Sequence, residues 1–134
     1  MNAPNARLSD LCILVVDDDK DTREILRFIL EREAAQVIAV STVEEAVEEY
    51  KRLSPDVVLA DIGMPQANGY ALISLIRAHD KPSGRSAPVI ALTGYTSEAD
   101  RLTAFAAGFQ RYISKPFDPA DIIEAIVAST GKGP

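Results

Sequence analysis

The residues most able to do chemistry in this sequence are aspartates that directly follow two apolar runs. Asp17–Asp19 follow the run at residues 12–16, and Asp61 follows the run at residues 57–60. Carboxylates held together in a partly dry site must either take up protons or hold a cation, because like charges repel. Oxygen ligands of this kind suit Mg²⁺, which needs only one or two protein carboxylates. The simpler alternative is a helix cap, which Asp19 or Asp21 could supply.

A threonine and a lysine occupy equivalent positions after two further apolar runs. Thr93 follows residues 89–92, and Lys115 follows residues 109–113 after one intervening serine. Phosphoryl transfer depends on positioning and on neutralising the charge of the equatorial oxygens, which a cation, an ammonium and a hydroxyl can share. An aspartate carboxylate is a competent acceptor and would form an acyl phosphate. Taken singly, Thr93 is an ordinary β-branched residue at a strand end and Lys115 an ordinary solvated lysine.

Five apolar runs alternate with segments of helical period, and this order predicts the elements that position these residues. The first four runs are rich in Val and Ile, as in parallel strands buried on both faces, whereas Gln110 and Arg111 break the last, as in an edge strand. The pattern predicts an α/β fold, (βα)₅, with a parallel sheet and helices on both faces. In such sheets, ligands bind beyond the carboxyl ends of the strands. The runs span residues 12–16, 37–40, 57–60, 89–92 and 109–113.

Two helix starts can be read from capping signals. Either Ser41 with Glu44 or Thr42 with Glu45 has the spacing of a capping box before the second helical segment. Asp118–Pro119 has the order of an N-cap and a first helical residue, and therefore begins the last helix.

Length and charge restrict the class of protein further. The chain has 134 residues, enough for one domain, which we place at residues 11–130 between a frayed extension (1–10) and a tail (131–134). The net charge of −6, with scattered Lys and Arg, argues against direct nucleic-acid binding. The lone Cys12 is expected to be a buried, inert thiol. We find neither a membrane-spanning apolar stretch nor a secretory signal, so we expect a cytoplasmic protein.

Together these pieces resemble the receiver (CheY-like) domain of two-component response regulators, over about residues 11–127. The resemblance implies a flavodoxin-like sheet with strand order 2-1-3-4-5. It also suggests the receivers of hybrid sensor kinases rather than those of DNA-binding regulators. The matching segments are Leu14-Val15-Val16-Asp17-Asp18, Asp61-Ile62-Gly63-Met64-Pro65 with Gly69, Ala91-Leu92-Thr93-Gly94 and Lys115-Pro116-Phe117.

The resemblance implies specific roles for the acidic residues. Asp61 would be the phosphoacceptor, and Asp18 and Asp61 would bind Mg²⁺ directly. The main-chain carbonyl of Gly63 would be a further ligand, and Asp17 would act mostly through water. Such a domain promotes its own phosphorylation and dephosphorylation but is a signalling switch rather than an enzyme.

The remaining implied roles concern the signal. Thr93 and Lys115 would hold the phosphoryl oxygens, and the Lys115–Pro116 bond resembles one that is cis in the family. Tyr112 would be the switch aromatic, which turns into space that Thr93 vacates; alternatively it only packs at a strand end. The output would pass to an unknown partner through residues 102–109, Arg111 and the last helix.

The phosphoryl donor would be a separate protein, a histidine kinase or a histidine phosphotransfer protein. The single histidine, His79, lies on the apolar side of a predicted helix and is expected to be structural.

Three other functions fit parts of the sequence. Asp17 and Asp19 have the spacing of a haloacid-dehalogenase-like phosphatase, although Asp21 stands where that family has Thr or Val. A mononucleotide or flavin binder would need a glycine- or hydroxyl-rich loop after the first strand, where this chain has three acids. A receiver that has lost phosphorylation and serves only for docking is the third alternative, and failure to accept phosphate would favour it.

Overall fold

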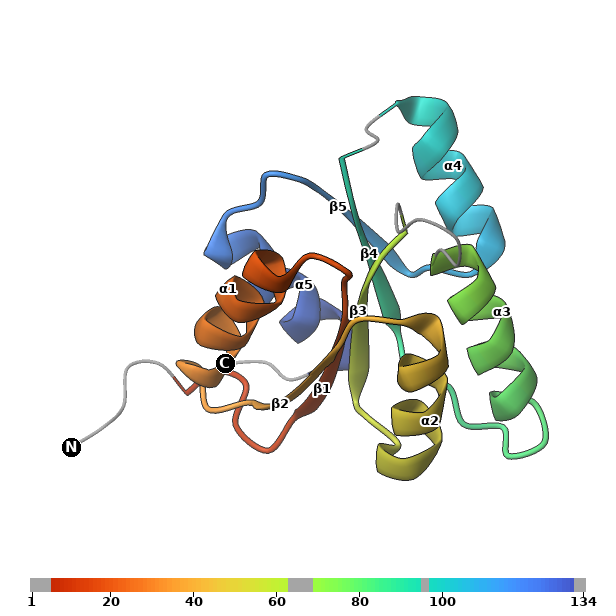
Figure 1. The fold of residues 1–134 in the computed structure, drawn as a ribbon, viewed down its shortest axis with the longest axis horizontal. Helices are drawn as coiled ribbons and strands as arrows, with labels where there is room; N and C mark the ends of the chain where they lie inside the picture. The colour runs from red at the N-terminus through yellow and green to blue at the C-terminus, as the bar shows by residue number, and fades with distance from the viewer. Residues whose placement is uncertain (1–5, 63–68, 95–96, 132–134) are drawn as a thin grey trace.

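The computed structural model describes residues 6–62, 69–94 and 97–131. Within them, five parallel strands form one sheet in the order β2-β1-β3-β4-β5 and alternate with five helices along the chain (Figure 1). This confirms the predicted flavodoxin-like (βα)₅ fold. The elements are β1 (Cys12–Val16), α1 (Lys20–Glu31), β2 (Gln36–Val40), α2 (Val43–Leu53), β3 (Val57–Asp61), α3 (Gly69–Asp80), β4 (Val89–Thr93), α4 (Glu98–Ala107), β5 (Arg111–Ser114) and α5 (Pro119–Thr130).

Helices cover both faces of the sheet, as predicted. Helices α1 and α5 lie on one face, and α2, α3 and α4 lie on the other (Figure 1). Successive side chains of a strand point to opposite faces, so β1 supplies Leu14 and Val16 to the core under α2, α3 and α4. The alternate residues Ile13 and Val15 enter the core under α1 and α5.

Burial is greatest in the central strands and least at the edges of the sheet. All five residues of β3 and of β4 are buried, whereas β5 contains no fully buried residue. The predicted edge position of the last strand is therefore confirmed. The strand begins two residues later than the apolar run, because Phe109 is a buried core residue that follows the helix-ending Gly108 (φ 114°).

The capping signals resolve the start of α2. Thr42 is the N-cap, and its Oγ1 accepts a hydrogen bond from the main-chain nitrogen of Glu45 at 3.1 Å. The Glu45 carboxylate in turn accepts from the main-chain nitrogen of Ser41 at 3.2 Å. The Thr42–Glu45 alternative is the correct one, and the start of α5 at Pro119 also agrees with the sequence.

Two expectations about the beginning of the chain were wrong. Residues 6–10 are not frayed: Leu8 is completely buried, and its main-chain nitrogen donates to the Glu33 carbonyl at 2.9 Å. The main-chain nitrogen of Arg7 donates to the Glu33 carboxylate at 3.1 Å. Cys12 is only partly buried, because it is the first residue of β1 at the end of the sheet. Burial, followed by the nearby Asp56 charge, raises the pKa of its thiol.

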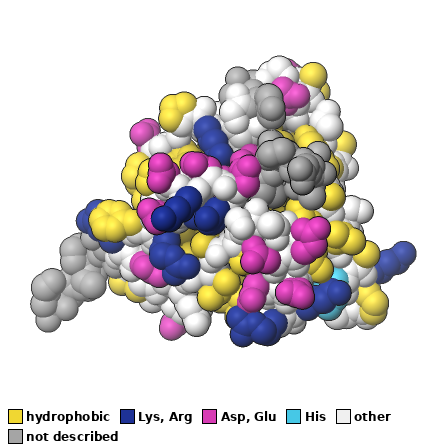
Figure 2. Space-filling model, viewed as in Figure 1, with side chains coloured by type: hydrophobic (Ala, Val, Ile, Leu, Met, Phe, Trp, Pro, Cys, Tyr) yellow, Lys and Arg dark blue, Asp and Glu magenta, His cyan; other side chains and the backbone are white. Residues whose placement is uncertain are grey.

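One face of the molecule is mixed in charge (Figure 2). On the face drawn in Figure 2, basic and acidic side chains are interspersed, and hydrophobic groups show at its left margin. No helix within the described part of the chain is long and apolar enough to cross a membrane.

Candidate metal centre

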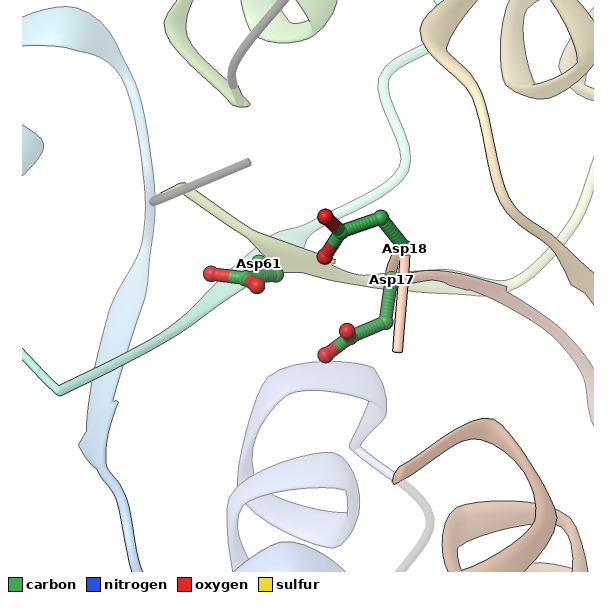
Figure 3. Close-up of side chains that lie close together, drawn as sticks. All are labelled: Asp17, Asp18 and Asp61. Atoms are coloured by element: carbon green, nitrogen blue, oxygen red, sulfur yellow. The ribbon is translucent and has the colours of Figure 1, made fainter. Parts of the chain in front are cut away.

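Three carboxylates converge where β1 and β3 end side by side. The two strands pair in parallel with Val16 opposite Ala60, so Asp17 and Asp61 are the next residues on neighbouring strands. Figure 3 shows their side chains and that of Asp18 around one space at this end of the sheet. Each residue offers a carboxylate oxygen, and these oxygens all lie within 4.8 Å of one another. The carboxylates that the sequence singled out therefore do form one group.

The members of this group differ in burial. Asp17 is completely buried and Asp61 is 9% exposed, whereas Asp18 is exposed. Burial raises the pKa of Asp17, because a dry environment disfavours its charged form, although hydrogen bonds from Asp19 and Lys115 oppose this effect.

Asp19 does not belong to the group but begins α1. Its Oδ2 accepts hydrogen bonds from the main-chain nitrogen of Thr22 at 3.1 Å and from the Thr22 hydroxyl at 2.6 Å. These bonds lower the pKa of Asp19. Its own main-chain nitrogen donates to Oδ1 of Asp17 at 2.9 Å, which fixes the carboxylate of Asp17 in the loop. The helix-cap alternative is correct for Asp19 alone.

Lys115 brings a positive charge to the carboxylates from the far end of the chain. Its Nζ lies 3.0 Å from Oδ2 of Asp17 and 3.3 Å from Oδ2 of Asp61. Burial would lower the pKa of Lys115, but the two carboxylates more than offset this effect and raise it. The main-chain nitrogen of Lys115 donates to the Thr93 carbonyl at 2.7 Å, and the Lys115–Pro116 peptide bond is cis.

Thr93 lies on β4, the neighbour of β3 in the sheet, and Tyr112 lies on β5, one strand further out. Leu92 pairs with Asp61, so Thr93 comes one residue beyond the level of Asp61, and it is completely buried. Tyr112 pairs with Ala91 and packs, half-buried, against the core under α4. It also lines a hollow of about 760 Å³ between α4, β5 and α5.

Two features near the site complete its description. Gly63, the predicted carbonyl ligand, lies outside the described residues. Sequence reasoning missed Arg23, whose Nη1 donates to the main-chain carbonyl of Asp17 at 2.8 Å. Its position in the second turn of the helix after the acidic run was the available signal, because such a side chain can reach back to the preceding strand end.

The site has the donor atoms and the charge for a divalent cation. Three carboxylates share one ammonium, so the group carries an excess of negative charge. Carboxylate oxygens are the ligands that Mg²⁺ prefers, and the exposed Asp18 leaves a path from solvent. Asp17, Asp18 and Asp61 together could therefore hold Mg²⁺.

Comparison with known proteins identifies the family. The model of the response regulator receiver domain matches residues 13–127. The chain belongs to this family. Receiver domains act in two-component signal transduction, as signalling modules rather than classical enzymes. Membership sets aside the phosphatase and nucleotide-binding alternatives.

Similar sequences include short and long proteins. The "Uncharacterized 14.6 kDa protein in sodA1 3'region" of Leptolyngbya boryana is 42% identical over 119 residues, which cover 89% of each chain. The transcriptional regulatory protein YvrH of Bacillus subtilis is 32% identical over 90% of this chain but only 49% of its own length. This chain thus spans about half the length of the transcriptional regulators that it matches.

Solved structures agree with the fold. The receiver domain of sensor histidine kinase PA1611 from Pseudomonas aeruginosa PAO1, with a magnesium ion in its active site cleft, is 30% identical. It superposes with a TM-score of 0.81, covering 90% of this chain and 98% of its own. Chemotaxis protein CheY4 of Vibrio cholerae is 22% identical with a TM-score of 0.82 over 91% and 98% of the two chains, which shows the shared fold. Because the relatives include both regulators and a sensor kinase receiver, the hybrid-kinase type stays a prediction.

Proposed function

We propose that this receiver domain accepts a phosphoryl group on Asp61, with Mg²⁺, and signals by the conformational change that follows. The observation that carries the proposal is the position of the Asp61 carboxylate. It shares one site with two further carboxylates and lies 3.3 Å from the Lys115 ammonium. An aspartate next to both a cation site and an ammonium has the two charges that phosphoryl transfer requires.

The reaction would be a displacement at phosphorus. An oxygen of Asp61 attacks the phosphorus of a phosphohistidine, and the O–P bond of an acyl phosphate forms as the P–N bond breaks. The leaving imidazole keeps the electron pair of the broken bond and takes up a proton. Asp17, Asp18 and Asp61 would hold Mg²⁺, which would supply neutralisation of the phosphoryl charge.

Lys115 and Thr93 would hold the other phosphoryl oxygens. The Lys115 ammonium already lies at the carboxylates and can move from Asp17 and Asp61 to the incoming oxygens. Thr93 ends the neighbouring strand, one residue beyond the level of Asp61, so its hydroxyl would move toward a phosphoryl group on Asp61.

The proposed switch links this movement to the surface. Thr93 is completely buried, so its displacement leaves space that a neighbouring side chain must fill, because protein interiors are densely packed. Tyr112 is half-buried on the adjacent strand and borders the hollow between α4, β5 and α5. Its inward rotation would change that face, and phosphorylation would shift the population toward the rotated state.

The partners follow from the same geometry. His79 is exposed near the end of α3, where its ring packs edge-on against Tyr50 with centroids 6.0 Å apart, away from Asp61 at the other end of the sheet, and we therefore assign the phosphoryl donor to another protein. The donor is a histidine kinase or a histidine phosphotransfer protein. The output partner binds the face formed by α4, β5 and α5, and the net charge of −6 favours a protein over a nucleic acid.

The test is phosphorylation by acetyl phosphate or a phosphorylated kinase in the presence of Mg²⁺. We expect stoichiometric labelling of the native protein, detected by intact-mass spectrometry, and none of Asp61→Asn. The matched control is Asp21→Asn, which removes an exposed aspartate of α1 outside the group and should label normally. Labelling retained in folded Asp61→Asn contradicts the assignment. If the native protein accepts phosphate from no donor, the docking-only alternative is favoured.

A further inference from the structure

One arginine forms a hydrogen bond to the main chain of the loop that carries the acidic residues. Arg23 lies in the second turn of α1, and its Nη1 donates to the main-chain carbonyl of Asp17 at 2.8 Å. A hydrogen bond from a charged donor is stronger than one between neutral groups. The bond therefore joins α1 to the end of β1 at the residue where the metal centre begins.

Asp17, which directly follows β1, forms hydrogen bonds through three other atoms. The main-chain nitrogen of Asp17 donates to the Val40 carbonyl at 3.1 Å, which continues the pairing of β1 with β2. Its Oδ1 accepts from Asp19 and its Oδ2 accepts from Lys115. The hydrogen bond from Arg23 to the Asp17 carbonyl is the fourth of these contacts. Without that bond, the peptide between Asp17 and Asp18 loses its link to the helix and can rotate.

Asp18 depends most on this link. It is the exposed carboxylate of the group, and it stands between Asp17, which Arg23 holds, and Asp19, which caps α1. A rotation of the preceding peptide would carry its side chain away from Asp17 and Asp61. Residues that orient metal ligands commonly change metal affinity by 10- to 100-fold when they are replaced.

We propose that Arg23 is a positioning residue of the metal centre, acting through the Asp17 carbonyl to hold Asp18 in place for the cation. This role rests on the proposed function of the carboxylates as a Mg²⁺ site. Arg23 touches neither the phosphoryl group nor the cation, so its effect is on the geometry of the free protein.

The direction in which Mg²⁺ affinity changes when Arg23 is replaced distinguishes a positioning role from a purely electrostatic one. As a positive charge near the site, Arg23 repels Mg²⁺, and its removal by itself would tighten binding. As a positioning residue, Arg23 favours Mg²⁺ binding, and its removal lowers the Mg²⁺ affinity. A measured change in affinity thus has opposite directions under the two roles.

The chain offers a matched control in Arg27, one turn further along α1. Its Nη1 donates to the Val37 carbonyl of β2 at 3.2 Å and pairs with Glu31 at 3.0 Å. Arg27→Met therefore removes the same charge and the same kind of helix-to-strand bond, away from the carboxylates. A loss of stability common to both variants reports the structural part of the effect.

The experiment titrates Mg²⁺ into the native protein, Arg23→Met and Arg27→Met, with calorimetry for affinity and amide hydrogen exchange in the metal-free state. We expect Arg23→Met to bind Mg²⁺ about tenfold more weakly and to exchange the Asp19 amide faster. Arg27→Met should match the native protein in both measurements. If Arg23→Met does not fold, Arg23→Lys, which keeps the charge but lacks the planar guanidinium, should bind Mg²⁺ more weakly than the native protein, in the direction that loss of an orienting residue gives.

Unchanged or tighter Mg²⁺ binding in a folded Arg23 variant overturns the role of Arg23 and leaves the proposed function intact. An equal loss of affinity in Arg27→Met also overturns it, because the effect is then not specific to Asp17. If the native protein itself neither binds Mg²⁺ nor accepts phosphate, the proposed function fails first, and the two failures are thereby distinguished.

Discussion

Buried carboxylates lie at both ends of the sheet, but they are balanced in different ways. At the amino end, Asp80 of α3 is 7% exposed and accepts from the Tyr50 hydroxyl at 2.8 and 3.0 Å and from Arg77 at 2.9 Å. At the carboxyl end, Asp17 is fully buried, and it shares the single ammonium of Lys115 with Asp61, with Asp18 alongside.

The difference shows how a structural carboxylate can be told from a functional one. Asp80 has one guanidinium for one carboxylate, so its charge is balanced inside the protein. The group of Asp17, Asp18 and Asp61 has one ammonium for three carboxylates, and this excess of negative charge favours the binding of a cation. Asp17 and Asp61 are buried to a similar degree as Asp80, so the balance of charge is the property that distinguishes them.

The largest effect on stability is expected at Asp80, whose charge is balanced inside the protein. Asp80→Ala leaves the Arg77 guanidinium and the Tyr50 hydroxyl without their acceptor, which should lower the free energy of unfolding by about 3 kcal/mol. Urea unfolding measures the loss. Mg²⁺ affinity should not change, because the two regions lie at opposite ends of the sheet. A clear change in Mg²⁺ affinity would show that the ends are coupled and that the comparison is incomplete.

A smaller effect with two opposite parts is expected from Lys115→Met. The metal-free protein should lose about 2 kcal/mol, because buried Asp17 loses a charged hydrogen bond. Mg²⁺ should nevertheless bind more tightly, because the competing ammonium is gone. Lys20→Met is the control, since Lys20 is exposed and pairs only loosely with Glu24 at 3.9 Å. Weaker Mg²⁺ binding in Lys115→Met would mean that the lysine organises the site rather than competing for it.

The smallest effect is a pH dependence that belongs to Asp17. Burial raises the pKa of Asp17 above its ordinary value of 3.8, so the folded protein holds this proton more tightly than the unfolded chain. The contribution of Asp17 to stability is therefore fully present below pH 3.8 and is lost as the pH rises through the folded pKa.

Melting curves in chelator across this pH range, for the native protein and Asp17→Asn, isolate the contribution as their difference. That difference should fall with rising pH, and saturating Mg²⁺ should reverse the trend because the cation binds the ionised form. A difference that does not vary with pH would mean that Asp17 ionises in the folded protein as it does in the unfolded chain.

Much of the fold and the positions of the site residues could be predicted because they depend on local periodicity. The apolar runs give the strands, and the rule that ligands bind beyond the carboxyl ends of parallel strands brings Asp17, Asp61 and Lys115 together. Asp17 and Asp61 are adjacent in space because β1 and β3 pair, which needs no knowledge of side-chain conformation. Lys115 follows β5, on the other side of β4, and reaches both carboxylates with its long side chain.

The features that were missed depend on contacts that periodicity does not encode. Tyr50 was predicted as part of an apolar helix face, but its hydroxyl binds Asp80 from another helix, 30 residues away. Leu8 precedes the first strand without any periodic pattern, yet it fills the core below α1. Arg23 was missed because its partner is a main-chain carbonyl, which every residue has, so only its position in the helix after the acidic run could have indicated the contact.

The bond between Lys115 and Asp17 spans 98 positions and so has a consequence for synthesis. A growing chain on the ribosome contains all three carboxylates by its first half, but it lacks their counterion until the fifth strand has emerged. Until then, the acidic residues repel one another without relief from the protein itself. The charge-balanced site therefore forms late in folding, after β5 has joined the sheet and brought Lys115 to Asp17.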